Sequence, residues 1–451
     1  MYYAHNLYLN GELVTDLVIP DSVTTIGNYA FQNCTSLTSV TISDSVTKIG
    51  DSAFEDCTSL TSVTIPDSVT SIGDSTFEDC SSLTSVTIPD SVTKIGDSAF
   101  IRCDSLTSVI IGNSITEIGY RVFEDCSSLT SVTIPDSVTS IGEEAFEGCD
   151  SLQKVFISDL SAWCRIDFAN YYANPLGNSA ALYINGELAT DIIIPDNVTS
   201  IGDYAFYWCD SLKSVTIGNG VTSIGKEAFE GCDSLTSVTI GNGVTTIGDS
   251  AFRDCTSLTS ITIPDSVTTI GDDAFRDCDS LTSVTIGNGV TTIGDSAFRD
   301  CTSLTSITIP NSVTTIGYAA FAYCTSLADV AIPDSVTTTG DYVFYGCTSL
   351  TDVTIPSGVT TIGEAAFYEC TSLTSVTIPD SVTEIGWYAF IYCSSLTSVY
   401  CKAATPPAGG SYMFDSNASG RKIYVPTASV EAYKSAEYWS GYKDYIVGYK
   451  F

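Results

Sequence analysis

The sequence predicts a repeat solenoid, because one pattern of 23 residues recurs along almost the whole chain. One unit reads IPDSVTSIGDSTFEDCSSLTSVT, from Ile65 to Thr87. A phenylalanine holds the same place in successive units, at Phe31, Phe54, Phe77, Phe100, Phe123, Phe146, Phe206, Phe229, Phe252, Phe275, Phe298, Phe321, Phe344, Phe367 and Phe390. A cysteine follows each of them by three residues, from Cys34 to Cys393. In such an array each unit buries its apolar face only by stacking on its neighbours.

Each unit is expected to contain one short strand. In the segment LTSVTI, residues 37–42, Val40 and Ile42 alternate with polar residues, which is the period of a half-buried strand. A Pro-Asp-Ser or Gly-Asn-Gly sequence then turns the chain. We therefore expect a parallel sheet on the concave side of a curved array, which is right-handed because parallel crossovers are right-handed.

The remainder of each unit is expected to return the chain to the next strand through a short helix. Asp74 is predicted to cap a helix that carries Phe77, with Cys80 one turn later on the same face. Thr339 replaces the usual Ile before Gly340, which predicts one loosely packed turn. The inward positions of one unit are then Val46, Ile49, Phe54, Cys57, Leu60, Val63 and Ile65.

Departures from the period predict the domain organisation. Residues 1–157 form a first repeat block and residues 195–401 a second one. Between them, 158–194 is one oversized repeat of 37 residues, rich in aromatics that either cover a widened core or serve a function. Residues 402–451 leave the pattern and are predicted to form the C-terminal cap that a solenoid needs to hide its last apolar face.

The chain is expected to begin inside a module. Residues 7–27 match residues 182–202, but the second copy follows a complete lead-in and the first follows only MYYAHN. The start has no basic and apolar signal segment, and we expect a truncated start of a longer surface protein.

Composition excludes several classes of partner. The formal net charge is −36, from 53 acidic and 17 basic residues, so the surface repels nucleic acid and anionic membranes. No apolar run approaches the ~20 residues of a membrane helix, which excludes membrane insertion. Solvated charge that keeps a repetitive chain soluble is the simpler interpretation of the acidity, and a basic partner is the alternative.

Catalytic chemistry is not expected, and the chain is predicted not to be an enzyme. The single histidine is His5, so no Ser-His-Asp or Cys-His arrangement can form in the array. No motif for a metal or a cofactor is present, and none is predicted. The fifteen in-register cysteines are predicted to be buried free thiols. Cys164 and Cys401 are out of register and, as a pair or singly, are expected to be more reactive than the others.

The L-x-x-V-x-I strands and the A-F-x-x-C-x-S-L segments resemble the BspA-like class of leucine-rich repeats over nearly the whole chain. This resemblance implies a leucine-rich repeat fold of the α/β type. It also implies a secreted or surface-displayed protein of a host-associated bacterium or parasitic protist, linked to adhesion to host matrix proteins or other cells.

We expect a ligand to bind where the repeat pattern is broken. A surface that is the same in every repeat cannot fix the position of a ligand along the array. The returns of the last units become aromatic, a residue class enriched at interface hot spots. The outward strand column, normally Thr, becomes apolar at Phe156 and Ile193. These two residues are expected on consecutive strands that flank the oversized repeat, where they either anchor a ligand or lie under the insertion. The aromatic candidates, which either bind or pack on the cap, are Tyr318, Tyr323, Tyr342, Tyr345, Tyr368, Trp387, Tyr388 and Tyr392.

Two hypotheses for function follow. The first is a cell-surface or secreted binding module for a protein or glycan ligand on a host or microbial surface. The second is a structural spacer that displays another domain. Ice binding through the Thr and Ser columns is a minor third hypothesis, which a curved array disfavours.

Overall fold

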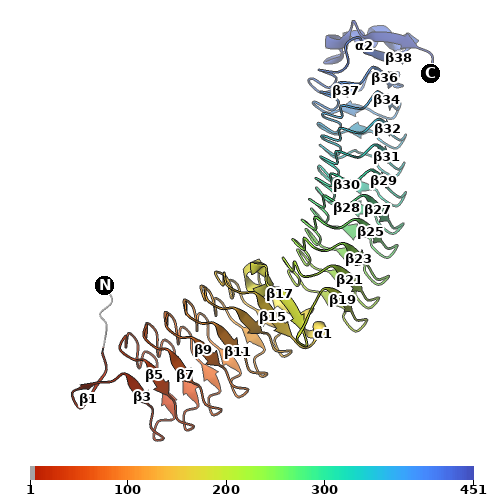
Figure 1. Ribbon diagram of the computed structural model, residues 1–451. Coiled ribbons are helices and arrows are strands. Elements are labelled where there is room, and N and C mark those ends of the chain that lie inside the picture. The colour runs from red at the N-terminus through yellow and green to blue at the C-terminus, as the bar shows by residue number, and fades with distance from the viewer. Residues whose placement is uncertain (1–5) are drawn as a thin grey trace. The chain divides into compact units, whose positions relative to one another are not determined.

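The computed structural model describes residues 6–451 and consists mainly of short parallel strands joined by turns (Figure 1). His5 lies outside the described residues. The chain divides into two compact units. The N-terminal unit runs to Thr190 and includes Ile201–Leu212, and the C-terminal unit comprises Asp191–Ser200 and Lys213–Phe451.

The N-terminal unit has one long sheet and two short ones. The long sheet has nine strands, which are β3 (Asp16–Val18), β5 (Ser39–Thr41), β7 (Ser62–Thr64), β9 (Ser85–Thr87), β11 (Ser108–Ile110), β13 (Ser131–Thr133), β15 (Lys154–Ile157), β17 (Ala181–Ile184) and β18 (Glu187–Leu188). Two-residue strands form the short sheets, with β4 (Thr25–Ile26), β6 (Lys48–Ile49), β8 (Ser71–Ile72) and β10 (Lys94–Ile95) in one and β12 (Glu117–Ile118), β14 (Ser140–Ile141) and β16 (Asp167–Phe168) in the other. A hairpin of β1 (Tyr8–Leu9) and β2 (Glu12–Leu13) precedes them.

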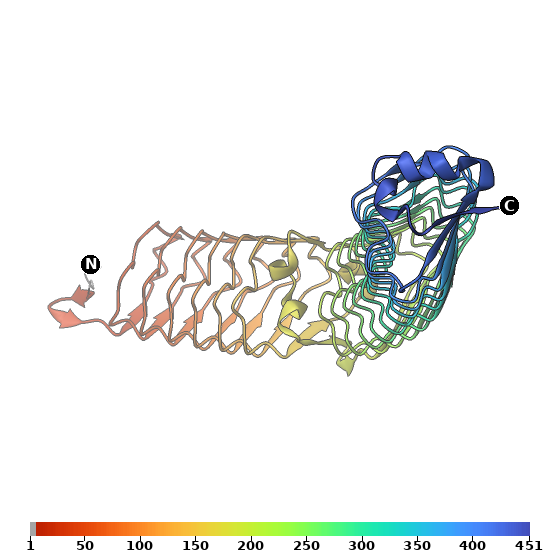
Figure 2. The same ribbon diagram turned by 90° about the horizontal axis from the view of Figure 1, so that it is seen from above.

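The C-terminal unit repeats this plan, and its turns superimpose when viewed along the stack (Figure 2). Its outer strands are β19 (Asp191–Ile194), β21 (Ser214–Ile217) and β23 (Ser237–Thr239), then a nine-stranded sheet of β25 (Ser260–Ile263), β27 (Ser283–Ile286), β29 (Ser306–Thr308), β31 (Asp329–Ala331), β32 (Asp352–Thr354), β34 (Ser375–Ile378), β36 (Ser398–Cys401), β38 (Lys422–Pro426) and β39 (Ile446–Tyr449). Its two-residue strands are β22 (Ser223–Ile224), β24 (Thr246–Ile247), β26 (Thr269–Ile270), β28 (Thr292–Ile293), β30 (Thr315–Ile316), β33 (Thr361–Ile362), β35 (Glu384–Ile385) and β37 (Ala408–Gly409). The strand β20 (Ser200–Ile201) lies at the division between the units.

The parallel sheet and the inward residues are confirmed. The strands of the regular repeats pair in parallel with residues one repeat later, as Val109 does with Val132. The seven side chains between Val46 and Ile65 that were predicted to point inward are all buried. Their exposed fraction ranges from 0% at Val46 to 8% at Val63. The hand and the curvature of the array stay predictions.

The returns differ from the predicted short helices. Ser75 and Asp79 have φ of 52° and 57°, outside the right-handed helical region. The amide of Ser75 donates to Asp97 O at 2.8 Å, and the amide of Phe77 donates to Ala99 O at 2.8 Å. Since a helix needs these amides for carbonyls of its own preceding turn, bonding to the next repeat excludes it. Asp74 accordingly accepts the Asp97 amide at 3.1 Å instead of capping a helix.

Helix is confined to short segments elsewhere in the described chain. The α-helices are α1 (Leu160–Trp163) and α2 (Val430–Ser435). The 3-10 segments are η1 (Tyr171–Ala173), η2 (Pro175–Asn178), η3 (Thr427–Ser429) and η4 (Trp439–Tyr442).

The phenylalanines form stacked columns inside the returns. The rings of Phe252 and Phe275 are 5.3 Å apart between centroids and lie 6° from parallel. In most repeats the thiol of the following cysteine donates to the carbonyl of the phenylalanine one repeat earlier, as Cys278 Sγ does to Phe252 O at 3.2 Å. At two places where the next cysteine of the pattern is missing, an amide donates instead: Asn178 to Phe146 O and Asn417 to Phe390 O.

The cysteines are free and buried, as predicted for the fifteen in register. The expectation that Cys164 and Cys401 are reactive is wrong, because both are 0% exposed. Burial raises the pKa of the Cys164 thiol to about 12 and that of Cys401 to about 11. A reactive thiol needs a stabilised and accessible thiolate, and neither position provides one.

Polar side chains also bond from turn to turn. The hydroxyl of Thr61 donates to Thr38 O at 3.0 Å, and Thr70 repeats this contact with Thr47 O at 3.1 Å. The turns lie so close together that a Cβ on Gly73 would be 2.5 Å from the Asp51 nitrogen, which explains the glycine there. At Thr338 only an isolated bridge to Thr361 remains, so the short sheet is interrupted beside Thr339, the position predicted to pack loosely.

The segment 158–194 contains more than one strand. Ile157 pairs with Ile184, so β17 completes a turn of 27 residues. The chain then reverses at Asn185-Gly186 into β18, which pairs antiparallel with β17. Phe156 therefore neighbours Tyr183 of this segment, and the prediction that the strands of Phe156 and Ile193 are consecutive is wrong.

The C-terminal segment covers the end of the phenylalanine column, at the place where the sequence predicts a cap. Strand β38 pairs with β36 and extends the sheet. Phe414 stacks on Phe390 at 5.5 Å and is covered by Trp439 at 5.9 Å. The indole of Trp439 donates to Pro407 O at 2.8 Å, and Tyr433 donates to Ala403 O at 2.7 Å. Both aromatic side chains are 0% exposed, so the cap is an integral end of the core.

Candidate binding surfaces

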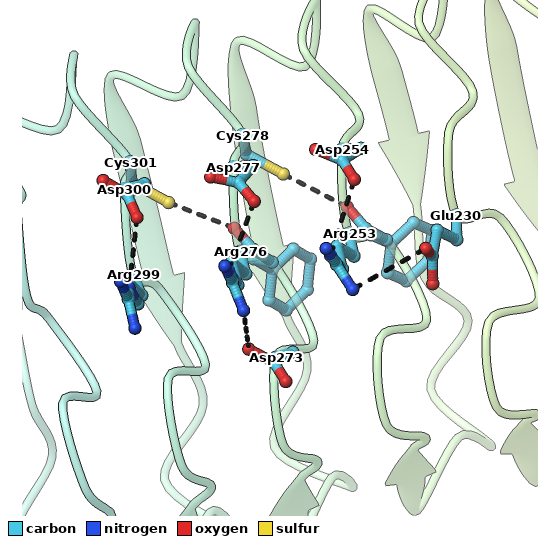
Figure 3. Close-up of polar contacts among 12 residues, drawn as sticks. Glu230, Arg253, Asp254, Asp273, Arg276, Asp277, Cys278, Arg299, Asp300 and Cys301 are labelled. Carbon is cyan, nitrogen blue, oxygen red and sulfur yellow. Dashed lines mark hydrogen bonds and ion pairs between the residues drawn. The ribbon is translucent and has the colours of Figure 1, made fainter.

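The returns display rows of side chains at one-turn spacing, because each repeat position recurs above its predecessor. Arginines in three successive returns pair with carboxylates of their own turns (Figure 3). Arg276 Nε lies 3.2 Å from Asp277 and its Nη1 lies 3.3 Å from Asp273. Arg299 Nε lies 3.1 Å from Asp300. The row is thus a ladder of ion pairs and not a basic patch.

Glu230 extends this row, but its environment disfavours a charged carboxylate. It is 8% exposed, and Arg253 lies 3.9 Å away (Figure 3). Burial, with repulsion from Glu227, raises the pKa of Glu230 to about 7. Burial likewise raises the pKa of Asp254 and Asp277. These carboxyl groups hold protons more tightly in the folded chain than in the unfolded chain.

We expect the free energy of unfolding to rise as the pH falls from 8 to 5, because the folded state then binds more protons than the unfolded state. Stability is lost as the pH rises through the folded pKa of Glu230, about 7. Glu230→Gln should flatten this profile by about 2 kcal/mol. Urea unfolding between pH 5 and 8 measures the change, with the exposed Glu384→Gln as the control. Identical profiles for the parent chain and Glu230→Gln would contradict the assignment.

Six of the predicted aromatic residues form one continuous surface, here named the return stripe: Tyr318, Tyr323, Tyr342, Tyr345, Tyr368 and Tyr392. Tyr345 is its centre, with ring centroids 4.5 Å from Tyr368 and 5.1 Å from Tyr323. Tyr318 is 48% exposed and Tyr392 is 46% exposed. The rings support one another and still present area to solvent.

The hydroxyl groups of the stripe add polarity. Tyr342 donates to Glu364 Oε1 at 3.0 Å, and burial, followed by this bond, raises the pKa of Tyr342 to about 12. Its phenol therefore stays protonated at neutral pH. Arg299 lies over the ring of Tyr323, 5.5 Å from its centroid, which joins the stripe to the ladder of ion pairs.

The other two predicted return aromatics lie nearer the cap. Tyr388 stacks on Tyr412 with centroids 5.7 Å apart, so packing against the cap segment applies to this residue. Trp387 is 55% exposed. Sequence reasoning missed Tyr412 because it falls where the period is already broken, 24 residues after Tyr388.

The two predicted residues of the strand face lie in different units. Phe156 is half-buried, and its ring contacts Tyr183 at 5.1 Å, so the segment 158–194 covers it in part. Ile193 is 72% exposed.

A groove along the strand face of the C-terminal unit was not predicted. It has a volume of about 720 Å³, and Ala331, Thr354, Thr377, Pro333 and Pro356 are among its lining residues.

A cluster of Glu124, Glu144 and Glu147 is the one group among residues 6–451 with carboxylates close enough for a metal ion, within 4.8 Å of one another. Arg121 lies 3.0 Å from Glu124 and also pairs with Glu144. The cluster is therefore already neutralised in part by a cation of the chain. Within the same residues no helix has the length and apolarity to cross a membrane.

Comparison with known proteins agrees with this architecture. A family model for the BspA type leucine-rich repeat region matches residues 4–129, 116–170, 180–305 and 291–421. The chain belongs to the BspA-type leucine-rich repeat family. A leucine-rich repeat protein from Bacteroides ovatus is 28% identical, with a TM-score of 0.52 over 86% of this chain and 84% of that one.

Other solved structures of leucine-rich repeat proteins are similar in sequence. A leucine rich cell surface protein from Faecalibacterium prausnitzii is 31% identical over 75% of this chain and 87% of that one, with a TM-score of 0.41. A leucine-rich repeat protein from Eubacterium ventriosum is 26% identical over 79% of this chain and 90% of that one, with a TM-score of 0.48. A search of curated proteins found no match.

Proposed function

We propose that this leucine-rich repeat chain is a non-catalytic binding module of a secreted or cell-surface protein, and that it holds a protein or glycan ligand on the return stripe. The observation that carries the proposal is the continuous contact of six tyrosine rings on an otherwise polar repeat surface. The name of the Faecalibacterium prausnitzii protein suggests the surface location.

The stripe has the physical properties of a contact surface. Tyrosine offers a large amphipathic area and loses little entropy on binding, because it has only two side-chain torsions. Here the rings are already held by their neighbours, as Tyr345 is by Tyr368 at 4.5 Å. The ordering cost of binding is therefore reduced further. The stripe also breaks the repeat and so defines one register for a ligand.

The alternative function is a spacer that displays another domain. The uniform stacking of the phenylalanines, 5.2 to 5.6 Å apart from Phe229 to Phe344, favours a stiff rod. A spacer requires no specific ligand, so a screen that finds no ligand for the stripe would favour it.

The test starts with an array of matrix proteins and glycans probed with the purified chain. For any ligand found, Tyr342→Ala and Tyr345→Ala should each weaken binding by about 1–2 kcal/mol, as expected of hot-spot residues. Binding should depend only modestly on salt unless the ligand is basic. Calorimetric titration measures both effects.

Two controls match these substitutions. Tyr29 holds the same repeat position as Tyr342 in the N-terminal unit and is 60% exposed, so Tyr29→Ala should leave binding unchanged. Thr87→Ala alters the regular outward column and should be nearly neutral. Silent tyrosine substitutions together with loss of binding in Thr87→Ala would place the site on the regular column and refute the proposal.

A further inference from the structure

The long turn of the N-terminal unit interrupts the phenylalanine column. Phe146 donates its amide to Tyr172 O at 3.1 Å, in the way that Phe123 donates to Ala145 O at 2.9 Å. This register places Ala173 where the next phenylalanine of the column would stand. Beside Phe146 lies a pocket of about 150 Å³.

Aromatic side chains form the walls of this pocket. Tyr171 and Tyr172 come from η1, and Tyr207 and Trp208 come from the following return. The centroid of Tyr171 lies 4.1 Å from that of Tyr172 and 5.6 Å from that of Tyr207. Tyr171, Tyr172 and Trp208 are 38%, 40% and 43% exposed, so the walls are open to solvent. In the sequence, Tyr207-Trp208 replaces the charged or small pair that most returns carry there.

Asparagine side chains hold the walls in place. Asn174 is 1% exposed, donates to Tyr204 O at 2.6 Å and accepts the amide of Leu176 at 2.9 Å. Asn178 donates to Phe146 O at 3.3 Å. The pocket is therefore formed before any ligand arrives, which lowers the entropic cost of binding.

The returns beside the pocket are mainly acidic, and Arg121 is paired with one of their acids, Glu144. The return that carries Phe146 holds four acids, which are Glu143, Glu144, Glu147 and Asp150. The return that carries Trp208 adds Asp203 and Asp210, and no Lys or Arg occurs between residues 166 and 212. This field repels anions and attracts cations. Tyrosine and tryptophan faces also attract cations, and the attraction is stronger where the cation is desolvated.

The size of the pocket restricts the ligand further. Its volume of about 150 Å³ is below the ~300–1,000 Å³ of drug-sized ligand sites. The pocket is therefore suited to one small head group and not to a larger organic molecule.

We propose that this pocket binds an organic ammonium group, supplied either by a lysine side chain of a partner or by a small quaternary ammonium ion. The site is separate from the return stripe and does not depend on the function proposed for the stripe.

The experiment titrates the full chain with tetramethylammonium and follows the methyl protons of this probe by NMR. We expect saturable binding that weakens as salt is added. Tert-butanol, a neutral molecule of similar size, should bind at least about tenfold more weakly, since it lacks the cation–π attraction. If N-acetyl-lysine amide displaces tetramethylammonium, the ligand group is a lysine side chain. If only the form of this compound that is trimethylated on Nζ displaces it, the ligand group is a quaternary ammonium.

Variants separate the pocket from the rest of the surface. Tyr172→Ala and Trp208→Ala should each weaken tetramethylammonium binding about tenfold, and Trp208→Phe should restore most of it. Tyr345→Ala and Trp387→Ala, which remove aromatics of the C-terminal unit, should leave binding unchanged. Thermal melting of each variant shows that it is folded. Equal binding of tert-butanol, no saturation below about 100 mM, or binding that survives both pocket variants would overturn the proposal.

Discussion

Deletion of residues 402–451 is expected to turn the chain into an aggregating species. Without the cap, Phe390, Leu396 and Val399, all 0% exposed in the intact chain, would form an apolar end with no neighbour. Strand β36 would also lose its pairing with β38 and become an open edge, which templates further strand pairing. Size-exclusion chromatography with light scattering measures the result. A truncated chain that stays monomeric and melts like the parent would show that the segment does not act as a cap.

A single residue tests the same interpretation with less disruption. Trp439→Ala should lower the free energy of unfolding by about 3–5 kcal/mol, because the indole is 0% exposed and its removal leaves a cavity against Phe414. Trp387→Ala is the matched control, since that indole is 55% exposed. Urea unfolding distinguishes the two variants.

Phe275→Ala is expected to have the second-largest effect, a loss of about 3–5 kcal/mol in the free energy of unfolding. The ring is 0% exposed and stacks on Phe252 and Phe298, each at 5.3 Å. Its removal breaks both stacks and leaves a cavity inside one turn. Since a solenoid is stabilised by contacts between neighbouring turns, amide exchange should accelerate first in the adjoining repeats.

The substitution has its control on the same return. Arg276 follows Phe275 directly and pairs with Asp273 and Asp277 at the surface, where ion pairs contribute little. Arg276→Ala should therefore change stability by less than about 1 kcal/mol. If Phe275→Ala were no more destabilising than Arg276→Ala, the stacked column would not be a main source of stability.

The two proposed binding surfaces differ in chemistry and are separable by experiment. The return stripe presents a row of tyrosine rings of the size of a macromolecular contact. The pocket beside Phe146 is sized for one ammonium head group. Tyr345→Ala should affect only ligands of the stripe, and Trp208→Ala only ligands of the pocket.

Prediction of the candidate sites from the sequence was partial for a physical reason. The tyrosines of the return stripe could be identified because they replace charged or small residues in a known row. The contact of these rings with one another could not be predicted, because ring packing depends on the side-chain torsions that adjacent turns allow. The pocket depends on which residues of the long turn lie beside Phe146, and a sequence with an insertion does not reveal which of its residues keeps the register.

The sequence by itself determined the stacking architecture, the inward side chains and the need for a cap. The 23-residue period decides which residues share a face, and the alternation around Val40 decides which side of each strand is buried. Only the tertiary structure decided the conformation of the returns. Asp74-Ser75 before Phe77 is compatible with a helix within one repeat, but the amides of Ser75 and Phe77 bond to the next repeat instead. Local sequence sets which conformations a segment can adopt, and the partners that neighbouring turns offer to its hydrogen-bonding groups select one of them.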